Sequence, residues 1–267
     1  MGDIRADQRY LRTVAYADDS GLRDRRALYA HQHPRIDLVA EVITAVGTHV
    51  GEWIADVGCG NGQYLPHVSR LGRVVGLDLS PGMLRSVAPE HGGPLMVADA
   101  QRLPLKTASI GAVIMMHTLY HLGEPNDAIS QAARVLKPGG RLVAGVGGPN
   151  HLNEISDLWD SAVHDAGLTV DADVRYLNTR VPESVLEDLL RQNFGNVVVR
   201  RLTSTAVVRT PEPVLRHAAS TTAARTARAR GTDLIPALAE QLHDHIARDG
   251  HYTFTTQVSL RTSTKDR

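Results

Sequence analysis

A glycine-rich turn between a predicted strand and a predicted helix constrains the fold of this chain more than any other feature. The segment Trp53–Val57 is short and apolar, Gly58, Gly60 and Gly62 follow at alternate positions, and 64–71 has helical spacing. Glycine tolerates positive φ and lets a ligand approach the backbone closely. This order is typical of a parallel sheet that binds a nucleotide at the carboxyl ends of its strands, although a tight structural turn would also explain the glycines.

Strand and helix patterns continue to alternate after this turn. Ser80 and Pro81 suit a helix start, as cap and first helical residue, and 128–136 has helical spacing. The stretch 137–140 is typical of a turn. Short apolar strands separated by helices predict a parallel sheet covered on both faces. The further strands expected here are 74–77, 94–97, 110–116 and 141–146.

The two flanks of this alternating segment are expected to be mainly helical. Residues 27–30 and 36–46 carry an apolar stripe at helical spacing, and Pro34 suits the first turn of the second helix. The stretch 218–231 is rich in Ala, Thr and Arg and is either a link or a helix. Beyond residue 150, the expected helices are 151–166, 182–193, 212–219 and 234–248, and the expected strands are 196–202 and 252–262.

The spacing of the glycines and the acids near them narrow the choice of nucleotide. Dinucleotide sites have G-x-G-x-x-G, whereas this turn has G-x-G-x-G and follows Asp56, which would repel a diphosphate and attract a cationic amino-acid group. Asp78 ends the next strand and can accept hydrogen bonds from two ribose hydroxyls, and Asp99 ends the third and can accept from an adenine amine. With the apolar side chain of Met83, they predict one nucleoside pocket, although each acid alone is also compatible with an exposed strand end.

Five segments together carry a resemblance to a known family. They are 54–62, 76–84, 97–104, 116–117 and 136–140. In these segments the chain resembles the class I S-adenosylmethionine-dependent methyltransferases, and among them the small-molecule group with ubiquinone/menaquinone-type motifs. The resemblance covers residues 50–147 well and 252–260 loosely. It implies an α/β fold with a Rossmann-like, seven-stranded, mostly parallel sheet, helices on both faces, an antiparallel last strand and a helical cap.

The resemblance also implies a cofactor, S-adenosyl-L-methionine, which leaves as S-adenosyl-L-homocysteine. The glycines would admit the cofactor, Asp56 would lie near its amino-acid end, and Asp78 would bind the ribose hydroxyls. Met83 would pack on the adenine, Asp99 would hold its edge, and His117 would close over the region of the methyl group. The expected cofactor-binding residues are Asp56, Gly58, Cys59, Gly60, Asn61, Gly62, Asp78, Leu79, Met83, Asp99, Ala100, Gln101, Met116 and His117.

Candidates for a catalytic general base follow the fourth and fifth strands, where the pocket should open. His117 and His121 lie one helical turn apart, and His151 precedes Glu154, which could orient its ring. Simple packing is the alternative for His121, and a solvated helix start for His151 and Glu154. Because no third ligand accompanies His117 and His121, we expect no metal. The expected acceptor-binding residues are Tyr10, Tyr16, Tyr29, Tyr120, His121, His151 and Glu154.

We expect three parts along the chain. Residues 1–50 form an N-terminal helical lid over the cofactor and the acceptor, and 51–150 form the cofactor-binding core. Residues 151–267 complete the core with the strands near 196–202 and 252–262. Two insertions in this last part, near 151–181 and 211–250, are expected to form a cap over the acceptor.

The balance of charges indicates which classes of partner to expect. The chain has 29 basic and 29 acidic residues, which gives no reason to expect nucleic acid or an anionic membrane. We expect methyl transfer by in-line displacement to a small molecule, such as a secondary metabolite or a quinone-like compound. The arginines at 200, 201, 209, 225, 228 and 230 keep an RNA methyltransferase open. A cyclase or regulatory protein that binds the cofactor without transferring its methyl group is also open.

Composition adds expectations about disulfides, the cellular compartment and the source of the protein. Cys59 is the single cysteine, so we expect no internal disulfide, and charged residues at the start argue against a signal peptide. No run of apolar residues suggests a membrane span, and the cytoplasm is the expected compartment. Abundant Ala, Gly and Arg hint at a bacterial source. Monomer and homodimer both stay open, as do O-, N- and C-methylation.

Overall fold

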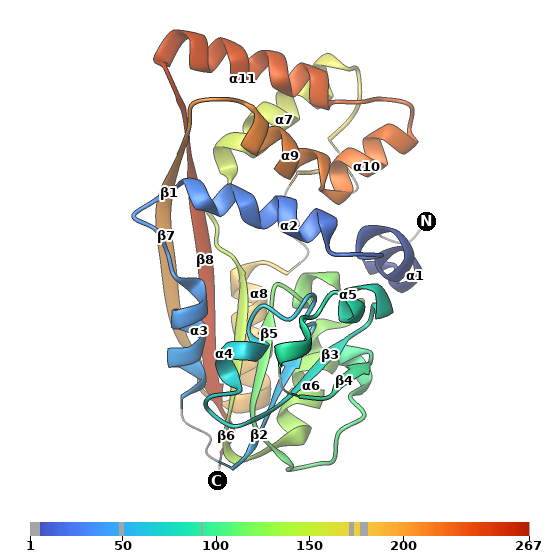
Figure 1. The fold of residues 1–267 in the computed structure, drawn as a ribbon, viewed down its shortest axis with the longest axis vertical. Helices are drawn as coiled ribbons and strands as arrows, with labels where there is room; N and C mark the ends of the chain where they lie inside the picture. The colour runs from blue at the N-terminus through green and yellow to red at the C-terminus, as the bar shows by residue number, and fades with distance from the viewer. Residues whose placement is uncertain (1–5, 48–50, 92, 171–173, 177–180, 267) are drawn as a thin grey trace.

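In the part of the chain that the structure describes, one sheet of eight strands organises the fold. The computed structural model describes residues 6–47, 51–91, 93–170, 174–176 and 181–266. The strand order is β1-β7-β8-β6-β5-β2-β3-β4, and the five strands from β6 to β4 run parallel (Figure 1). The strands are β1 Gln32–His33, β2 Trp53–Val57, β3 Arg73–Asp78, β4 Leu95–Val97, β5 Ile110–Met116, β6 Leu136–Gly147, β7 Val198–Val208 and β8 Tyr252–Thr264.

The predicted Rossmann-like fold is confirmed, with a small difference in strand count. Strand β8 runs antiparallel to both β6 and β7. The additional strand is β1, in which Gln32 and His33 pair antiparallel with Ala206 and Thr205 of β7. Because two residues are too few for an alternating pattern, this strand could not be predicted from the sequence.

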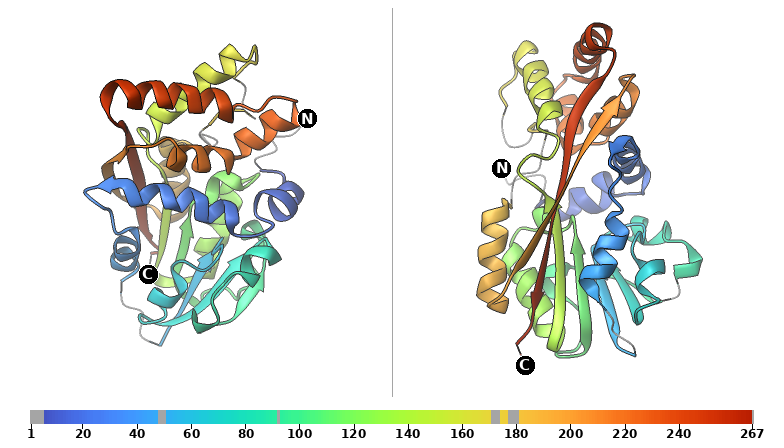
Figure 2. Two further views of the ribbon diagram at one scale, coloured as in Figure 1. Left: turned by 45° about the horizontal axis from the view of Figure 1, so that its top comes forward. Right: turned by 90° about the vertical axis from the view of Figure 1, so that its left-hand side faces the viewer.

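Helices cover both faces of the parallel strands (Figure 2). Side chains alternate between the faces along a strand, so Val113 and Met115 of β5 pack toward α6 and α8, whereas Ala112 and Ile114 pack toward α3 and α4. The α-helices are α1 Gln8–Tyr10, α2 Ser20–Ala27, α3 Leu38–Val46, α4 Leu65–Val68, α5 Pro81–Arg85, α6 Pro125–Val135, α7 Asn153–Asp165, α8 Glu183–Phe194, α9 Glu212–Ala219, α10 Thr222–Ala229 and α11 Ile235–Asp249.

A second core lies beyond the carboxyl ends of the parallel strands. Strands β7 and β8 pair over their whole length, from Val198 opposite Thr262 to Val208 opposite Tyr252, and so extend past β6. On this extension α7, α9, α10 and α11 gather at the top of Figure 1. Trp159 of α7 is fully buried there, and its indole Nε1 donates to the carbonyl of Val174 at 2.8 Å. The described parts of the predicted cap segments therefore pack together.

Several local predictions need correction. Pro34 precedes α3 and is not in its first turn, because Asp37 caps the helix by accepting from the amide of Ala40 at 3.0 Å. The stretch 137–140 is a bulge within β6, where the pairing with β5 shifts register, and not a free turn. The helix expected over 64–71 ends early as α4, because Leu71 donates to the carbonyl of Val68 and tightens the last turn.

The boundaries between the predicted lid, core and cap stay predictions. The stretch 218–231 contains helix α10, which resolves the choice between a link and a helix. Residues 1–5 and 48–50 of the predicted lid, and 171–173 and 177–180 of the first predicted cap segment, lie outside the described residues. Within the described part of the chain, no helix has the length and apolar character needed to cross a bilayer.

Candidate cofactor and acceptor site

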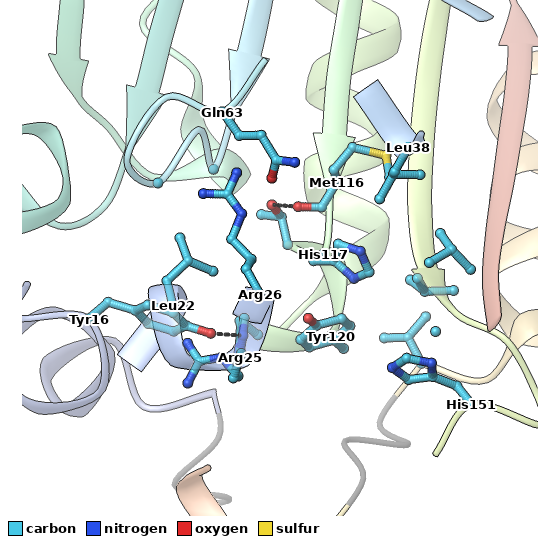
Figure 3. Close-up of a pocket in the computed structure, with 18 of the residues that line it drawn as sticks. Tyr16, Leu22, Arg25, Arg26, Leu38, Gln63, Met116, His117, Tyr120 and His151 are labelled. Carbon is cyan, nitrogen blue, oxygen red and sulfur yellow. Dashed lines mark hydrogen bonds between the residues drawn. The ribbon is translucent and has the colours of Figure 1, made fainter. Parts of the chain in front are cut away.

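A cavity of about 1400 Å³ lies where β2, β3, β4 and β5 end. It runs from the glycine turn, past Arg25 and Arg26 of α2 (Figure 3), to His217 of α9 and Thr222 of α10. Ligand pockets usually measure roughly 300–1,000 Å³, so this cavity has room for a cofactor and an acceptor together. Most predicted site residues line it. Those that do not are Asp56, Gly62, Gln101, Tyr10 and Glu154.

The glycine turn forms one wall of the cavity. Gly58 has φ +75°, and a Cβ atom there would lie 2.2 Å from Oγ1 of Thr118, so no other residue fits. Gly60 has φ +55° and faces the cavity. Gly62 was predicted to touch the cofactor, but it lies behind the turn, where a Cβ would come within 2.9 Å of Val87. The turn therefore presents bare backbone to a ligand at its first two glycines.

Two carboxylates follow the turn along the edge of the sheet. Asp78, at the end of β3, accepts from the amide of Gly60 at 2.9 Å and of Ser80 at 2.8 Å. Burial raises the pKa of Asp78, while these two hydrogen bonds act in the opposite direction. Asp99, after β4, accepts from the amide of Gln101 at 2.9 Å and from Nε2 of Gln8 at 2.7 Å. Each carboxylate oxygen has two lone pairs, so both residues can accept further bonds from a ligand.

Asp56 lies beneath the turn and does not line the cavity. Its side chain is 2% exposed, and Oδ2 has no hydrogen-bond partner among the described residues. Burial, and then the nearby charge of Asp78, raise the pKa of Asp56 to about 8. The sequence predicts Asp56 beside the amino-acid end of the cofactor, but its buried side chain does not line the cavity, and with a pKa of about 8 it is mostly uncharged at pH 7.

The N-terminal segment closes over the glycine turn. Asn61 accepts from Nη1 of Arg26 at 3.0 Å and donates to Asp19 at 3.1 Å, which ties α2 to the turn. Oγ of Ser80 donates to the carbonyl of Tyr16 at 2.6 Å. The carbonyl of Ala17 passes so close to α5 that Gly82 has no room for a Cβ. Sequence reasoning missed Gln8, Ser80 and Arg26 as site residues, because no local pattern marks contacts with so distant a segment.

Three tyrosine–histidine pairs line the upper part of the cavity. Oη of Tyr16 lies 2.8 Å from Nε2 of His121, and Oη of Tyr29 lies 3.2 Å from Nε2 of His151. The third pair, which the sequence did not reveal, has Oη of Tyr176 at 2.6 Å from Nδ1 of His217. The first two pairs join the N-terminal segment to the loops after β5 and β6. Tyr120 also lines the cavity, with its ring 4.5 Å from that of His121 between centroids.

The surroundings of the candidate bases differ. His117 has φ +56°, its amide donates to Gly145, and burial lowers its pKa to about 4. His151 accepts from the amide of Gln257 at Nδ1 (3.0 Å), so its neutral ring carries the proton on Nε2, toward Tyr29. Burial lowers the pKa of His151 to about 3. With both nitrogens engaged, His151 is arranged to hold Tyr29 and not to remove a proton.

Two residues predicted to bind the acceptor are elsewhere. Glu154 was expected to orient His151, but its carboxylate accepts from the amide of Thr255 at 3.0 Å and from its hydroxyl at 2.7 Å. It therefore fixes α7 to β8. Tyr10 lies on the short helix α1, outside the cavity lining. Across the residues that the structure describes, no group of three or more His, Cys, Asp or Glu side chains could hold a metal ion.

Comparisons with known proteins match part of this chain to methyltransferases. Residues 55–144 match the family model of a methyltransferase domain. An uncharacterized 37.1 kDa protein in transposon TN4556 of Streptomyces fradiae is 29% identical over 80% of this chain and 63% of its own length. A ubiquinone biosynthesis O-methyltransferase of Xanthomonas oryzae is 34% identical over 44% of this chain and 50% of its own. The chain thus spans less than two thirds of these relatives.

A solved structure extends the similarity to the whole fold. A protein of Anaeromyxobacter dehalogenans, described as a candidate type II methyltransferase, superposes with a TM-score of 0.64 at 18% identity, over 86% of this chain and 96% of that one. The fold and the matched domain confirm the resemblance to class I S-adenosylmethionine-dependent methyltransferases. The segment that matches the methyltransferase domain model, residues 55–144, includes the glycine turn, Asp78 and Asp99.

Proposed function

We propose that this protein transfers the methyl group of S-adenosylmethionine to a small-molecule acceptor. The observation that carries the proposal is the order of groups at the sheet edge. The glycine turn, Asp78 and Asp99 follow β2, β3 and β4 and line one cavity, which continues into a chamber lined by Tyr16, Tyr29 and other rings. The O-methyltransferase among the relatives, which is named for ubiquinone biosynthesis, supports a small organic acceptor.

The residues present fit this cofactor. Asp78 can bind the ribose hydroxyls, and the backbone at Gly58 and Gly60 is open to the methionine portion. Met83 offers an apolar wall for the adenine, whose amine would donate to Asp99. We place the cofactor carboxylate near Arg26, because Nη1 of Arg26 already lies at the glycine turn and its side chain points toward Gln63 (Figure 3). The bound cofactor supplies a methyl group that is already activated on a sulfonium.

The chain's own task is then to exclude water and align the acceptor. Alignment of two reactants can contribute about 7–11 kcal/mol in the best intramolecular cases. The N-terminal segment covers the cavity through the Tyr16–His121 and Tyr29–His151 pairs. His117 is neutral at pH 7, because its pKa is about 4, and lies at the end of β5 beside Met116. We propose that His117 closes the site around the methyl group of the cofactor. We propose His121 as the general base that would remove a proton from the acceptor.

The alternative of an RNA substrate loses support from the same structure. Of the arginines that kept it open, Arg200 pairs with Glu41 at 2.8 Å, Arg201 with Glu183 at 2.8 Å, and Arg228 with Asp233 at 3.2 Å. Guanidinium groups held by carboxylates are poorly placed to neutralise phosphates. Arg200, Arg201 and Arg228 are therefore held in ion pairs at the surface.

One experiment separates the three functions. The protein is incubated with S-adenosylmethionine labelled in its methyl group and with either a small-molecule extract or total RNA from a bacterial culture. Methyl label in the small-molecule fraction is the expected result. Label in RNA would favour the alternative acceptor. Saturable cofactor binding with no label in either fraction would favour a protein that binds the cofactor without transferring its methyl group.

A further inference from the structure

Arg25 lies in the upper chamber, the part of the cavity that the three tyrosine–histidine pairs line. The hydrogen-bonding capacity of its guanidinium is only partly used. Arg25 lies on α2, next to Arg26 in sequence but pointing away from the glycine turn, near Tyr16 (Figure 3). Its Nη1 donates to the carbonyl of Ser220 at 2.8 Å, and its guanidinium carbon lies 5.3 Å from the centre of the Tyr16 ring. Nη2 is buried and has no hydrogen-bond partner among the described residues.

A purely structural role explains only part of this arrangement. Ser220 ends α9, and a cation at a helix C-terminus is favourable, so the bond from Nη1 secures α2 to α9. That bond leaves Nη2 as a buried, charged donor without an acceptor, which is unfavourable. Arg25 forms no ion pair with any carboxylate of the described chain, unlike Arg23 on the same helix, which pairs with Asp19 at 3.2 Å. Arg25 lines the cavity, so a rotation of its guanidinium would present Nη2 to an anionic ligand there.

The surroundings of Arg25 belong to the acceptor side of the cavity. Its charge acts on His117 and His217, whose pKa values burial, and then nearby cations, lower to about 4 and about 3. These rings are therefore neutral at pH 7 and do not share the positive charge. The carboxylates nearest the cofactor region, Asp78 and Asp99, are each engaged with backbone amides at the other end of the cavity.

The chamber around Arg25 is also rich in aromatic rings. Tyr16, Tyr29 and Tyr120 line it, and the Tyr16 ring stands edge-on to His121 with centroids 5.3 Å apart. Aromatic side chains favour flat, unsaturated partners through offset stacking and edge-to-face contacts. We infer that the acceptor is an aromatic acid whose carboxylate binds the guanidinium of Arg25. This inference rests on the proposed function and names the class of acceptor that it takes.

Matched acids and amides test the inference on protein saturated with S-adenosylhomocysteine. The probes are salicylate with salicylamide and 4-hydroxybenzoate with 4-hydroxybenzamide, which differ in charge and little in shape. Calorimetry should show each acid binding about tenfold or more tighter than its amide, because a bond to a buried charge is worth more than a neutral one. Arg25→Gln should bring the ratio close to one, whereas Arg23→Gln, the control on the same helix, should preserve it.

Two further measurements keep the outcome clear. Arg25→Lys retains the charge and should restore part of the preference for the acid, even if Arg25→Gln loosens the contact with α9. The affinity for S-adenosylhomocysteine is measured first on every variant, and its absence from the wild type would refute the proposed function itself. With that affinity intact, no saturable binding of either acid, equal binding of acid and amide, or a preference that survives Arg25→Gln would overturn the inference about Arg25.

Discussion

At the carboxyl edge of β2, β3 and β4, the cavity wall consists of backbone and short acids that follow one strand after another. In the upper chamber, the wall consists of side chains that meet from distant segments. Tyr16 reaches His121 across 105 residues, and Tyr29 reaches His151 across 122. The lower region lies within the segment that matches the methyltransferase domain model, so we assign the cofactor to it. The upper region can change with single substitutions, so we assign to it the choice of acceptor.

This division also explains what the sequence could predict. The glycine turn, Asp78 and Asp99 belong to continuous segments with a strand before and a turn after, so their position at one edge followed from strand order. The pairs in the upper chamber depend on how the N-terminal segment and the helices beyond residue 150 fold back. No spacing in the chain links Tyr176 to His217, and none assigns Arg25 and Arg26 to different ends of the cavity.

Replacement of Gly58 should give the largest effect and tests the backbone wall of the lower region. In Gly58→Ala, the new Cβ would meet Oγ1 of Thr118, and alanine would have to adopt φ +75°. Overpacking costs about 1–3 kcal/mol and the left-handed conformation about 1–2 kcal/mol, so the free energy of unfolding should fall by roughly 2–5 kcal/mol. Urea denaturation measures it.

Gly139→Ala is the matched control for this variant. Gly139 also has positive φ, at +78°, but a Cβ there would meet nothing within 4 Å. Only the conformational cost of about 1–2 kcal/mol should appear. Equal losses in Gly58→Ala and Gly139→Ala would mean that the contact with Thr118 does not shape the turn.

A pH series on Asp56→Asn tests whether ionisation of the buried Asp56 lowers the stability of the protein. The pKa of Asp56 is raised from 3.8 to about 8, so between these values the folded protein binds a proton that the unfolded chain does not. Stability of the wild type should therefore fall as the pH rises from about 4 to about 8, and then stay level with respect to this group. Asparagine removes this dependence.

The stability gained by Asp56→Asn should thus grow with pH and exceed about 1 kcal/mol at pH 9, given about 1.4 kcal/mol for each unit of pKa shift. Asp127→Asn, at an exposed side chain, serves as the control and should show no such trend. Thermal unfolding across the series supplies the measurement. A difference between Asp56→Asn and the wild type that does not change with pH would contradict the burial argument.

Removal of one hydroxyl from the upper chamber should give the smallest effect. Tyr29→Phe deletes the partner of Nε2 of His151. The expected loss of stability is about 1 kcal/mol, the net worth of one hydrogen bond, and the affinity for S-adenosylhomocysteine should not change. Tyr10→Phe, outside the cavity lining, is the control. A fall in cofactor affinity for Tyr29→Phe would contradict the proposal that the lower region alone binds the cofactor.

The central claim is that the edge formed by β2, β3 and β4 binds S-adenosylmethionine, and Asp78 tests it most directly. Calorimetric titration with S-adenosylhomocysteine compares the wild type with Asp78→Ala and with Asp165→Ala as the control. Loss of hydrogen bonds to a charged acceptor should weaken binding about 10–100-fold in Asp78→Ala and leave the control unchanged. An unchanged affinity in Asp78→Ala would contradict the assignment of the site.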